Sequence, residues 1–206
     1  MTGVLIVFGI LTVIALFMFF IKRQEEQGGR KQLKKPKKGG DDPLLSEGAH
    51  ARSHELMRLK VGDALSITGD TYTISQKLIF REGSFEWMEY RLSDGETTRW
   101  LEVEDDDELW LALYQEVDDL KLRDAPGAEL TYKGVDYELD EKGSATMRKE
   151  GEGPAHGRLP ECRYYDFEAE EGDGVLSIEQ WGENYEASVG RRLSPHAIEV
   201  FPGAAS

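Results

Sequence analysis

Cysteine and histidine are scarce in this sequence, which leaves few residues for common catalytic or metal sites. There is one cysteine, Cys162, and there are four histidines among 206 residues. A lone cysteine cannot form an intrachain disulfide. His50 and His54 stand four residues apart, as in some zinc sites, but no further ligand follows at a suitable spacing. The sequence therefore predicts no metal site.

Motifs that specify a reaction are also missing. Cys162 has no histidine at a distance that indicates an activated nucleophile. The glycines of residues 151–153 do not lie between a strand and the start of a helix, as a phosphate-binding loop requires. We therefore predict that the protein is not an enzyme and uses no cofactor.

Charge is absent from the first 21 residues. The run from Val4 to Ile21 is apolar except for the hydroxyl of Thr12, and as a helix it is about 27 Å long, enough to span a bilayer. A secretory signal peptide is the alternative, but no basic residue precedes the run and no small-residue cleavage site follows it. We predict a membrane anchor over residues 1–21, with residues 3–21 as one transmembrane helix.

A basic flank follows this apolar run and predicts its orientation. Basic residues near a membrane helix mark the cytoplasmic side, which places the N-terminus outside and the rest of the chain in the cytoplasm, at the cell membrane. Residues 22–45 are predicted to be a flexible tether. The basic side chains either contact anionic lipid or act only as a topology signal. They are Lys22, Arg23, Arg30, Lys31, Lys34, Lys35, Lys37 and Lys38.

Basic charge is scarce beyond the tether. The 17 basic and 38 acidic side chains outside the basic flank give a net charge of -21. A domain with this charge repels nucleic acid and anionic lipid. We therefore expect no nucleic-acid partner.

The remaining sequence alternates between apolar and polar residues, as β-strands do. After a short lead-in helix within Ser46–Leu59, residues 61–74 read as a hairpin, and residues 86–92, 97–104 and 109–117 as a three-stranded meander. The alternation predicts a core face formed by Met88, Tyr90, Leu92, Leu101 and Val103. The opposite face carries Trp87, Glu89, Arg91, Trp100, Glu102 and Glu104.

An internal repeat extends this pattern. Residues 62–72 match residues 127–137 at an offset of 65, and an offset of 75 pairs Tyr90 with Tyr165 and Glu104 with Glu179. The Gly-rich stretch 138–161 then reads as a loop. We predict an all-β, mainly antiparallel fold of two similar small barrel or sandwich units in tandem, residues 46–122 and 123–206. Recurrent hairpin chemistry is the alternative explanation of the match.

The polar face of the meander supplies the candidate binding residues Trp87, Glu89, Trp100, Glu102 and Glu104. The tryptophans either form a second buried layer or an exposed patch suited to a cation or a partner peptide. The neighbouring acidic run Asp105–Asp107 lacks the spacing and central glycine of a calcium loop, so a solvated turn is expected.

The segments Trp87–Leu92 and Trp100–Glu104, with Gly62 and Asp63 before them, resemble a bacterial domain of unknown function, family 4178. The likeness is clear over residues 60–117 and weaker around Cys162–Phe167, which lacks a tryptophan. Members look like non-catalytic β domains whose genes tend to accompany membrane-stress scaffolds and polyamine-synthase-like proteins. The resemblance implies an accessory role at the envelope.

Two functions follow as hypotheses. The first is a membrane-tethered, non-catalytic module that binds a protein partner at the cytoplasmic face of the membrane. The second is a receptor for a cation or polyamine, held by Glu89, Glu102, Glu104 and Asp105–Asp107 through charge complementarity.

Overall fold

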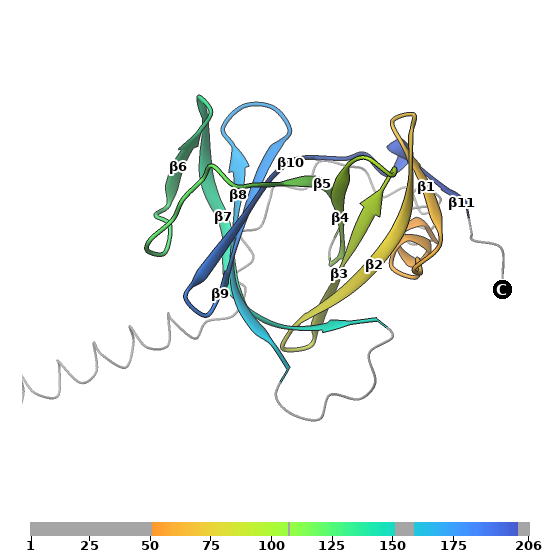
Figure 1. Cartoon of the computed structure of the whole chain (residues 1–206), viewed down its shortest axis with the longest axis horizontal. Coiled ribbons are helices and arrows are strands. Elements are labelled where there is room, and N and C mark those ends of the chain that lie inside the picture. Colours follow the sequence, from red (N-terminus) through yellow and green to blue (C-terminus); the bar gives the residue numbers. More distant parts are fainter. Residues whose placement is uncertain (1–50, 107, 151–158, 202–206) are drawn as a thin grey trace, which may run out of the picture. The chain divides into compact units, whose positions relative to one another are not determined.

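The computed structural model describes residues 51–106, 108–150 and 159–201 (Figure 1). The predicted anchor, the tether and its eight basic residues lie outside these ranges. Within them, no helix is both long and apolar enough to cross a membrane.

The described residues form one antiparallel sheet of eleven strands. Their bounds are β1 Ala64–Ile67, β2 Asp70–Glu82, β3 Phe85–Ser93, β4 Thr98–Asp105, β5 Leu109–Val117, β6 Glu129–Tyr132, β7 Val135–Lys149, β8 Glu161–Ala169, β9 Gly174–Trp181, β10 Asn184–Arg192 and β11 Ile198–Phe201. A 3-10 turn, Pro195–Ala197, precedes β11. The all-β, antiparallel prediction is confirmed.

Eight of these strands close into a barrel. The order β2-β3-β4-β5-β10-β9-β8-β7 becomes a ring because β7 also pairs with β2, with Leu78 opposite Lys149 and Arg81 opposite Thr146. The prediction of two separate units in tandem is therefore wrong. Residues 70–117 and 135–192 each supply half of a single barrel wall, and the two halves meet at the β5–β10 and β2–β7 pairings.

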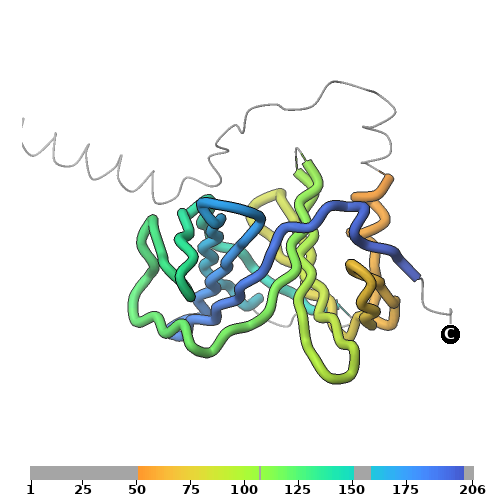
Figure 2. The backbone as a smooth tube through the Cα atoms, turned by 90° about the horizontal axis from the view of Figure 1, so that it is seen from above, coloured from red at the N-terminus to blue at the C-terminus, as the bar shows by residue number. Residues whose placement is uncertain are grey.

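Three further strands lie outside the ring. β1 pairs with β2 on one side and with β11 on the other, so the C-terminal end of the described chain returns to lie beside its first strand (Figures 1 and 2). β6 extends β7 in the same way that β1 extends β2.

The two outer hairpins share local geometry at the predicted offset of 65. Thr68 and Gly69 have positive φ in the β1–β2 turn, as do Lys133 and Gly134 in the β6–β7 turn. Two successive positive-φ residues are what a tight hairpin turn with the twist of its strands requires. The bulges after Ile74 in β2 and after Leu139 in β7 also fall 65 residues apart.

The predicted loop over residues 138–161 is wrong for most of its length. Residues up to Lys149 continue β7, which pairs with β8 and closes the barrel on β2. Gly143 is needed here because a Cβ atom at this position would lie 2.5 Å from the hydroxyl of Tyr164. The glycine that indicated a loop thus permits close packing inside a strand.

The larger apolar clusters lie on the outer face of the wall. The predicted core residues of β3 and β4 are buried there against the N-terminal helix, β1 and β11. On the other half, Tyr165, Phe167, Leu176 and Ile178 are buried with Tyr132 of β6. Each half of the barrel therefore carries its own outer core.

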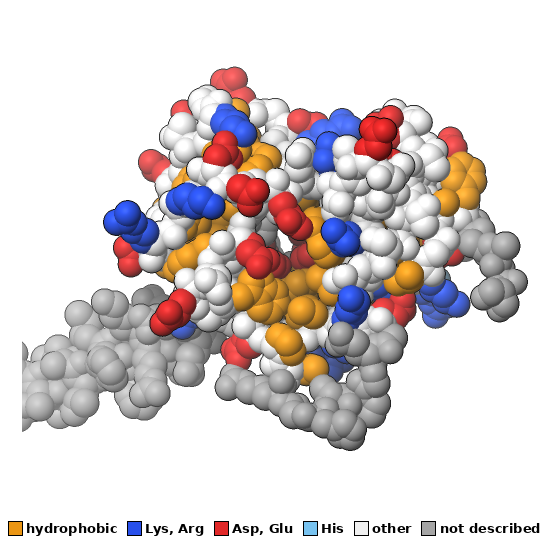
Figure 3. Space-filling model, viewed as in Figure 1, with side chains coloured by type: hydrophobic (Ala, Val, Ile, Leu, Met, Phe, Trp, Pro, Cys, Tyr) orange, Lys and Arg blue, Asp and Glu red, His pale blue; other side chains and the backbone are white. Residues whose placement is uncertain are grey.

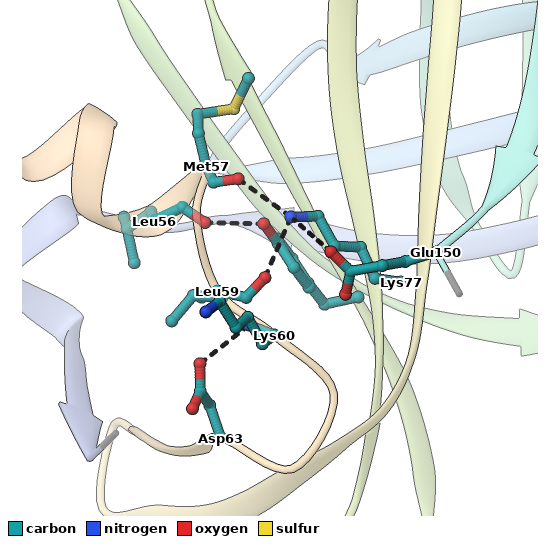
Figure 4. A network of polar contacts seen from close by, with 8 residues as sticks. Leu56, Met57, Leu59, Lys60, Asp63, Lys77 and Glu150 are labelled. Atoms are coloured by element: carbon teal, nitrogen blue, oxygen red, sulfur yellow. Dashed lines mark hydrogen bonds and ion pairs between the residues drawn. The ribbon is translucent and has the colours of Figure 1, made fainter. Parts of the chain in front are cut away.

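The end of the N-terminal helix is fixed to this outer face by two polar side chains (Figure 4). The helix is described over residues 51–56, and Leu56 and Leu59 are buried. The ammonium of Lys77, only 6 % exposed, donates to the carbonyls of Met57 and Leu59 at 3.2 and 3.0 Å. The hydroxyl of Tyr90 donates to the carbonyl of Leu56 at 2.8 Å. Terminal helix carbonyls lack partners within the helix, and these bonds supply them.

Tyr90→Phe tests this attachment. It leaves the buried carbonyl of Leu56 without its donor, so the free energy of unfolding is expected to fall by about 1–3 kcal/mol in urea denaturation. Tyr185→Phe, at a half-buried position on β10, is the control and is expected to change it by less than ~0.5 kcal/mol. Equal stability of the two variants would contradict the role of the Tyr90 hydroxyl.

Candidate functional site

The inner face of the barrel is polar and encloses a cavity of about 370 Å³. Successive side chains of a strand point to opposite faces, so Glu89 and Glu102 point inward from strands whose Tyr90 and Leu101 point outward. In Figure 3, acidic side chains surround a hollow in the middle of the face shown. An eight-stranded barrel is wide enough to hold one small ligand, and the volume is within the range of ligand pockets.

Carboxylates dominate the charge of the cavity. Among the described residues that line it there is no lysine, arginine or histidine. Two Glu–Glu pairs face each other directly across neighbouring strands, Glu89 with Glu102 and Glu179 with Glu186. Like charges opposite one another destabilise a sheet. The lining carboxylates are Glu89, Glu102, Glu116, Glu179 and Glu186.

Aromatic rings form part of the same wall. Trp100 and Tyr114 are cross-strand neighbours on β4 and β5, and Trp181 lies at the end of β9. One side of the interior is filled by a buried layer in which Trp87 stacks on Phe80, with ring centroids 5.2 Å apart, and packs edge-on against Tyr164. The apolar layer fills part of the barrel and leaves the acidic cavity beside it.

All four tryptophans donate to a carboxylate. The indole of Trp100 donates to Glu116 at 2.7 Å, and that of Trp181 to Glu179 at 3.0 Å. Trp87 and Trp110 hydrogen-bond Glu89 and Glu102 respectively. These bonds fix the orientation of the carboxylates without neutralising their charge.

Burial and mutual repulsion make the inner carboxylates hard to ionise together. Burial raises the pKa of Glu89 well above its usual range, and the charges of Glu179 and Glu102 raise it further. The pKa of Glu102 is likewise raised, first by burial and then by Asp166, Glu104 and Glu179. Both groups therefore keep their protons to a higher pH than an exposed glutamate does.

Two further carboxyl groups titrate near neutrality. Burial raises the pKa of Asp166 to about 7, opposed by a hydrogen bond from Ser177 and aided by Glu141. Burial also raises the pKa of Glu179 to about 7, opposed by Trp181 and aided by Glu186 and Glu116. Strongly perturbed groups in a cavity are typical of functional sites.

The sequence placed its candidate binding residues on the strand face opposite the predicted core. That face is the inner face of the barrel, and three of the candidates line the cavity. These three are Glu89, Trp100 and Glu102. Trp87 lies in the buried layer at 9 % exposure. Glu104 shares the inner face between Trp87 and Trp110 but does not line the cavity. Trp87 therefore fits the interpretation of a second buried layer, whereas Trp100 is half-buried in the cavity wall.

The other sequence candidates lie away from the cavity. Asp105 and Asp106 are exposed at the end of β4, and Asp107 is outside the described residues. Within the described ranges, no group of three or more metal-ligating side chains is placed to hold an ion. Cys162 is buried in the inner apolar layer, and burial raises its pKa above its usual range.

Several acidic and aromatic lining residues were not among the sequence candidates: Tyr114, Glu116, Glu179, Trp181 and Glu186. The repeat aligned Glu179 with Glu104 at the offset of 75. Because Glu179 follows buried Ile178, strand alternation could have placed it on the same inner face as the candidate glutamates. Glu116 and Glu186 carried no comparable signal, because charged residues on strands usually face solvent.

The fold and the cavity together define a closed β-barrel with an acidic and aromatic interior. A family model described as a domain of unknown function (DUF4178) matches residues 60–195. The chain belongs to this family.

Curated relatives share most of the chain. Uncharacterized proteins of Mycobacterium tuberculosis and Mycobacterium bovis are 34 % identical over 155 residues, which cover 70 % of this chain and 72 % of theirs. An uncharacterized protein of Aquifex aeolicus is 27 % identical over 158 residues, covering 71 % of this chain and 84 % of its own. No solved structure matches the chain.

Proposed function

We propose that the barrel binds a small organic cation in its interior. The observation that carries this proposal is the cavity itself, about 370 Å³ in volume and lined by five glutamates and three aromatic rings. Of the two hypotheses drawn from the sequence, this one agrees better with the geometry. The expected set of acidic residues changes, because Glu116, Glu179 and Glu186 line the cavity, whereas Glu104, Asp105 and Asp106 do not.

Charge and shape both favour such a ligand. A bound cation offsets the repulsion of the Glu89–Glu102 and Glu179–Glu186 pairs, and in the partly dry interior each ion pair is stronger than in water. The faces of Trp100, Tyr114 and Trp181 attract cations and cover apolar methylene groups. An anion meets only repulsion from the same wall.

Isothermal titration of the purified full chain in mild detergent with spermidine tests the proposal. At about 0.15 M salt, where exposed charges are screened beyond ~8 Å, we expect saturable binding that equal ionic strength of NaCl does not reproduce. Bound ligand at a hundredfold excess over its Kd should stabilise the fold by about 2.7 kcal/mol.

A charge-matched pair of variants locates the site. Glu89→Gln/Glu102→Gln removes the inner cross-strand pair and is expected to weaken spermidine binding at least tenfold, about 1.4 kcal/mol. Glu129→Gln/Glu138→Gln removes another cross-strand glutamate pair, exposed on β6 and β7, and should bind like the parent. Equal affinity for the two variants, or no binding by the parent, would overturn the proposal.

Membrane attachment and a protein partner remain part of the proposal on sequence grounds. The predicted anchor, the tether and a non-catalytic role at the cytoplasmic face are consistent with a binding barrel held near the membrane. Two sequence features support the membrane attachment: the apolar run of residues 4–21 and the basic flank after it.

A further inference from the structure

The glutamates that line the cavity lie at two depths. Glu89 and Glu102 are half-buried and face each other on β3 and β4. Glu116 and Glu186 are exposed and lie on the adjacent strands β5 and β10. Glu179 lies directly opposite Glu186 on β9 and β10, and its charge also acts on Glu89 and Glu102.

An aromatic row separates the two levels. Glu102 pairs with Ala112, Trp100 pairs with Tyr114, and Glu116 follows two residues further along β5. Ala112 and Glu116 are four residues apart, about 13 Å at roughly 3.3 Å per residue. Along its length, the cavity therefore has acidic residues at one level, aromatic rings at the next, and acidic residues again beyond them.

We propose, resting on the function proposed above, that the ligand is an extended aliphatic amine with an ammonium group at each end. One ammonium lies between Glu89 and Glu102, the other at Glu116 and Glu186, and the methylene chain between them contacts Trp100 and Tyr114. A compact ligand with one positive charge could contact only one of the two glutamate pairs. Glu116 is oriented for this contact because the Trp100 indole holds its carboxylate.

The proposal is tested by titrating the full chain with putrescine and with butylamine, which have the same carbon chain but two amino groups and one. Lengthening the series with cadaverine and spermidine varies the separation of the charges. We expect the best diamine or polyamine to bind at least tenfold more tightly than butylamine at about 0.15 M salt.

The outer level is tested by Glu116→Gln/Glu186→Gln. Both side chains are exposed, so the variant should fold normally, which thermal denaturation verifies. It is expected to lose at least tenfold in affinity for the best diamine or polyamine and less than threefold for butylamine. Glu129→Gln/Glu138→Gln again serves as the charge-matched control.

The outcomes separate the two proposals. Binding of spermidine together with equal affinity for diamines and butylamine overturns the two-level ligand and leaves the cation site standing. The same holds if the outer variant affects both ligands equally. Absence of binding by every amine overturns the cation site, and the two-level ligand with it.

Discussion

Glu89→Gln/Glu102→Gln is expected to make the ligand-free protein more stable at pH 8. The substitution removes two carboxyl groups that repel each other and Glu179, and the glutamine carbonyls still accept the indole hydrogen bonds of Trp87 and Trp110. Like charges directly opposite each other in a sheet cost up to about 1 kcal/mol, and because Glu89 and Glu102 repel both each other and Glu179, we expect a gain of about 2 kcal/mol. The melting temperature should rise by roughly 4–8 °C.

The parent protein should lose stability as the pH rises from 5 to 8. Carboxyl groups whose folded-state pKa lies above the unfolded value bind more protons in the folded state, so the free energy of unfolding falls as pH rises between the two values. For Asp166 and Glu179 this interval runs from their ordinary values to about 7. Two groups over about two pH units would lower the free energy of unfolding by at most about 5 kcal/mol. Because both side chains are partly exposed and screened by solvent, we expect a loss of about 3 kcal/mol.

Calorimetric melting at pH 5, 6, 7 and 8 checks both expectations. The parent should melt at a lower temperature at pH 8 than at pH 5, and Glu89→Gln/Glu102→Gln should show a smaller difference. Glu129→Gln/Glu138→Gln should follow the parent. A melting temperature that rises over this interval would contradict the raised pKa values inside the barrel.

Gly190→Ala is expected to destabilise the barrel by about 3 kcal/mol. Gly190 on β10 faces Tyr114 on β5, at the pairing that joins the two halves. A Cβ atom there would lie 2.3 Å from the carbonyl oxygen of Leu113 and 2.9 Å from the Cα of Tyr114. Because these contacts are with backbone atoms, no rotamer change relieves them, and the strands must separate.

Urea denaturation measures this change against Gly127→Ala. At Gly127 an added Cβ would meet its nearest neighbour, the carbonyl oxygen of Glu129, at an ordinary 3.9 Å. The control should therefore remain within ~0.5 kcal/mol of the parent. A Gly190→Ala variant as stable as Gly127→Ala would show that the β5–β10 pairing tolerates a wider spacing.

The sequence predicted the strands of the first half well because local alternation specifies them. Met88, Tyr90, Leu92, Leu101 and Val103 are buried together as expected. The hairpin turns and the bulges of the two halves also fall at the repeat offset of 65, since both features depend on residues close together in the chain. The alternation of apolar and polar residues shows that the two faces of a strand differ. It does not show which face encloses a cavity.

Local sequence patterns could not predict that the sheet closes into a barrel. Closure depends on the pairing of Leu78–Arg81 with Thr146–Lys149, which are distant in sequence. Gly143 and the polar residues around it looked like a loop because their packing partners, Tyr164 and Glu82, belong to other strands. If the sheet is not known to close, glutamates on this face are expected to contact solvent. Glu116 and Glu186 were therefore not recognised as cavity residues.

The β5–β10 and β2–β7 pairings join the two halves of the barrel. The cavity is therefore lined by residues that are far apart in the sequence. Glu89 and Glu102 come from the first half, whereas Glu179 and Glu186 come from the second. The proposed cation would therefore contact both halves and would be released when either one unfolds. Added ligand is then expected to stabilise the β5–β10 pairing, and slower hydrogen exchange of the β5 and β10 amides would measure how much of the barrel is occupied.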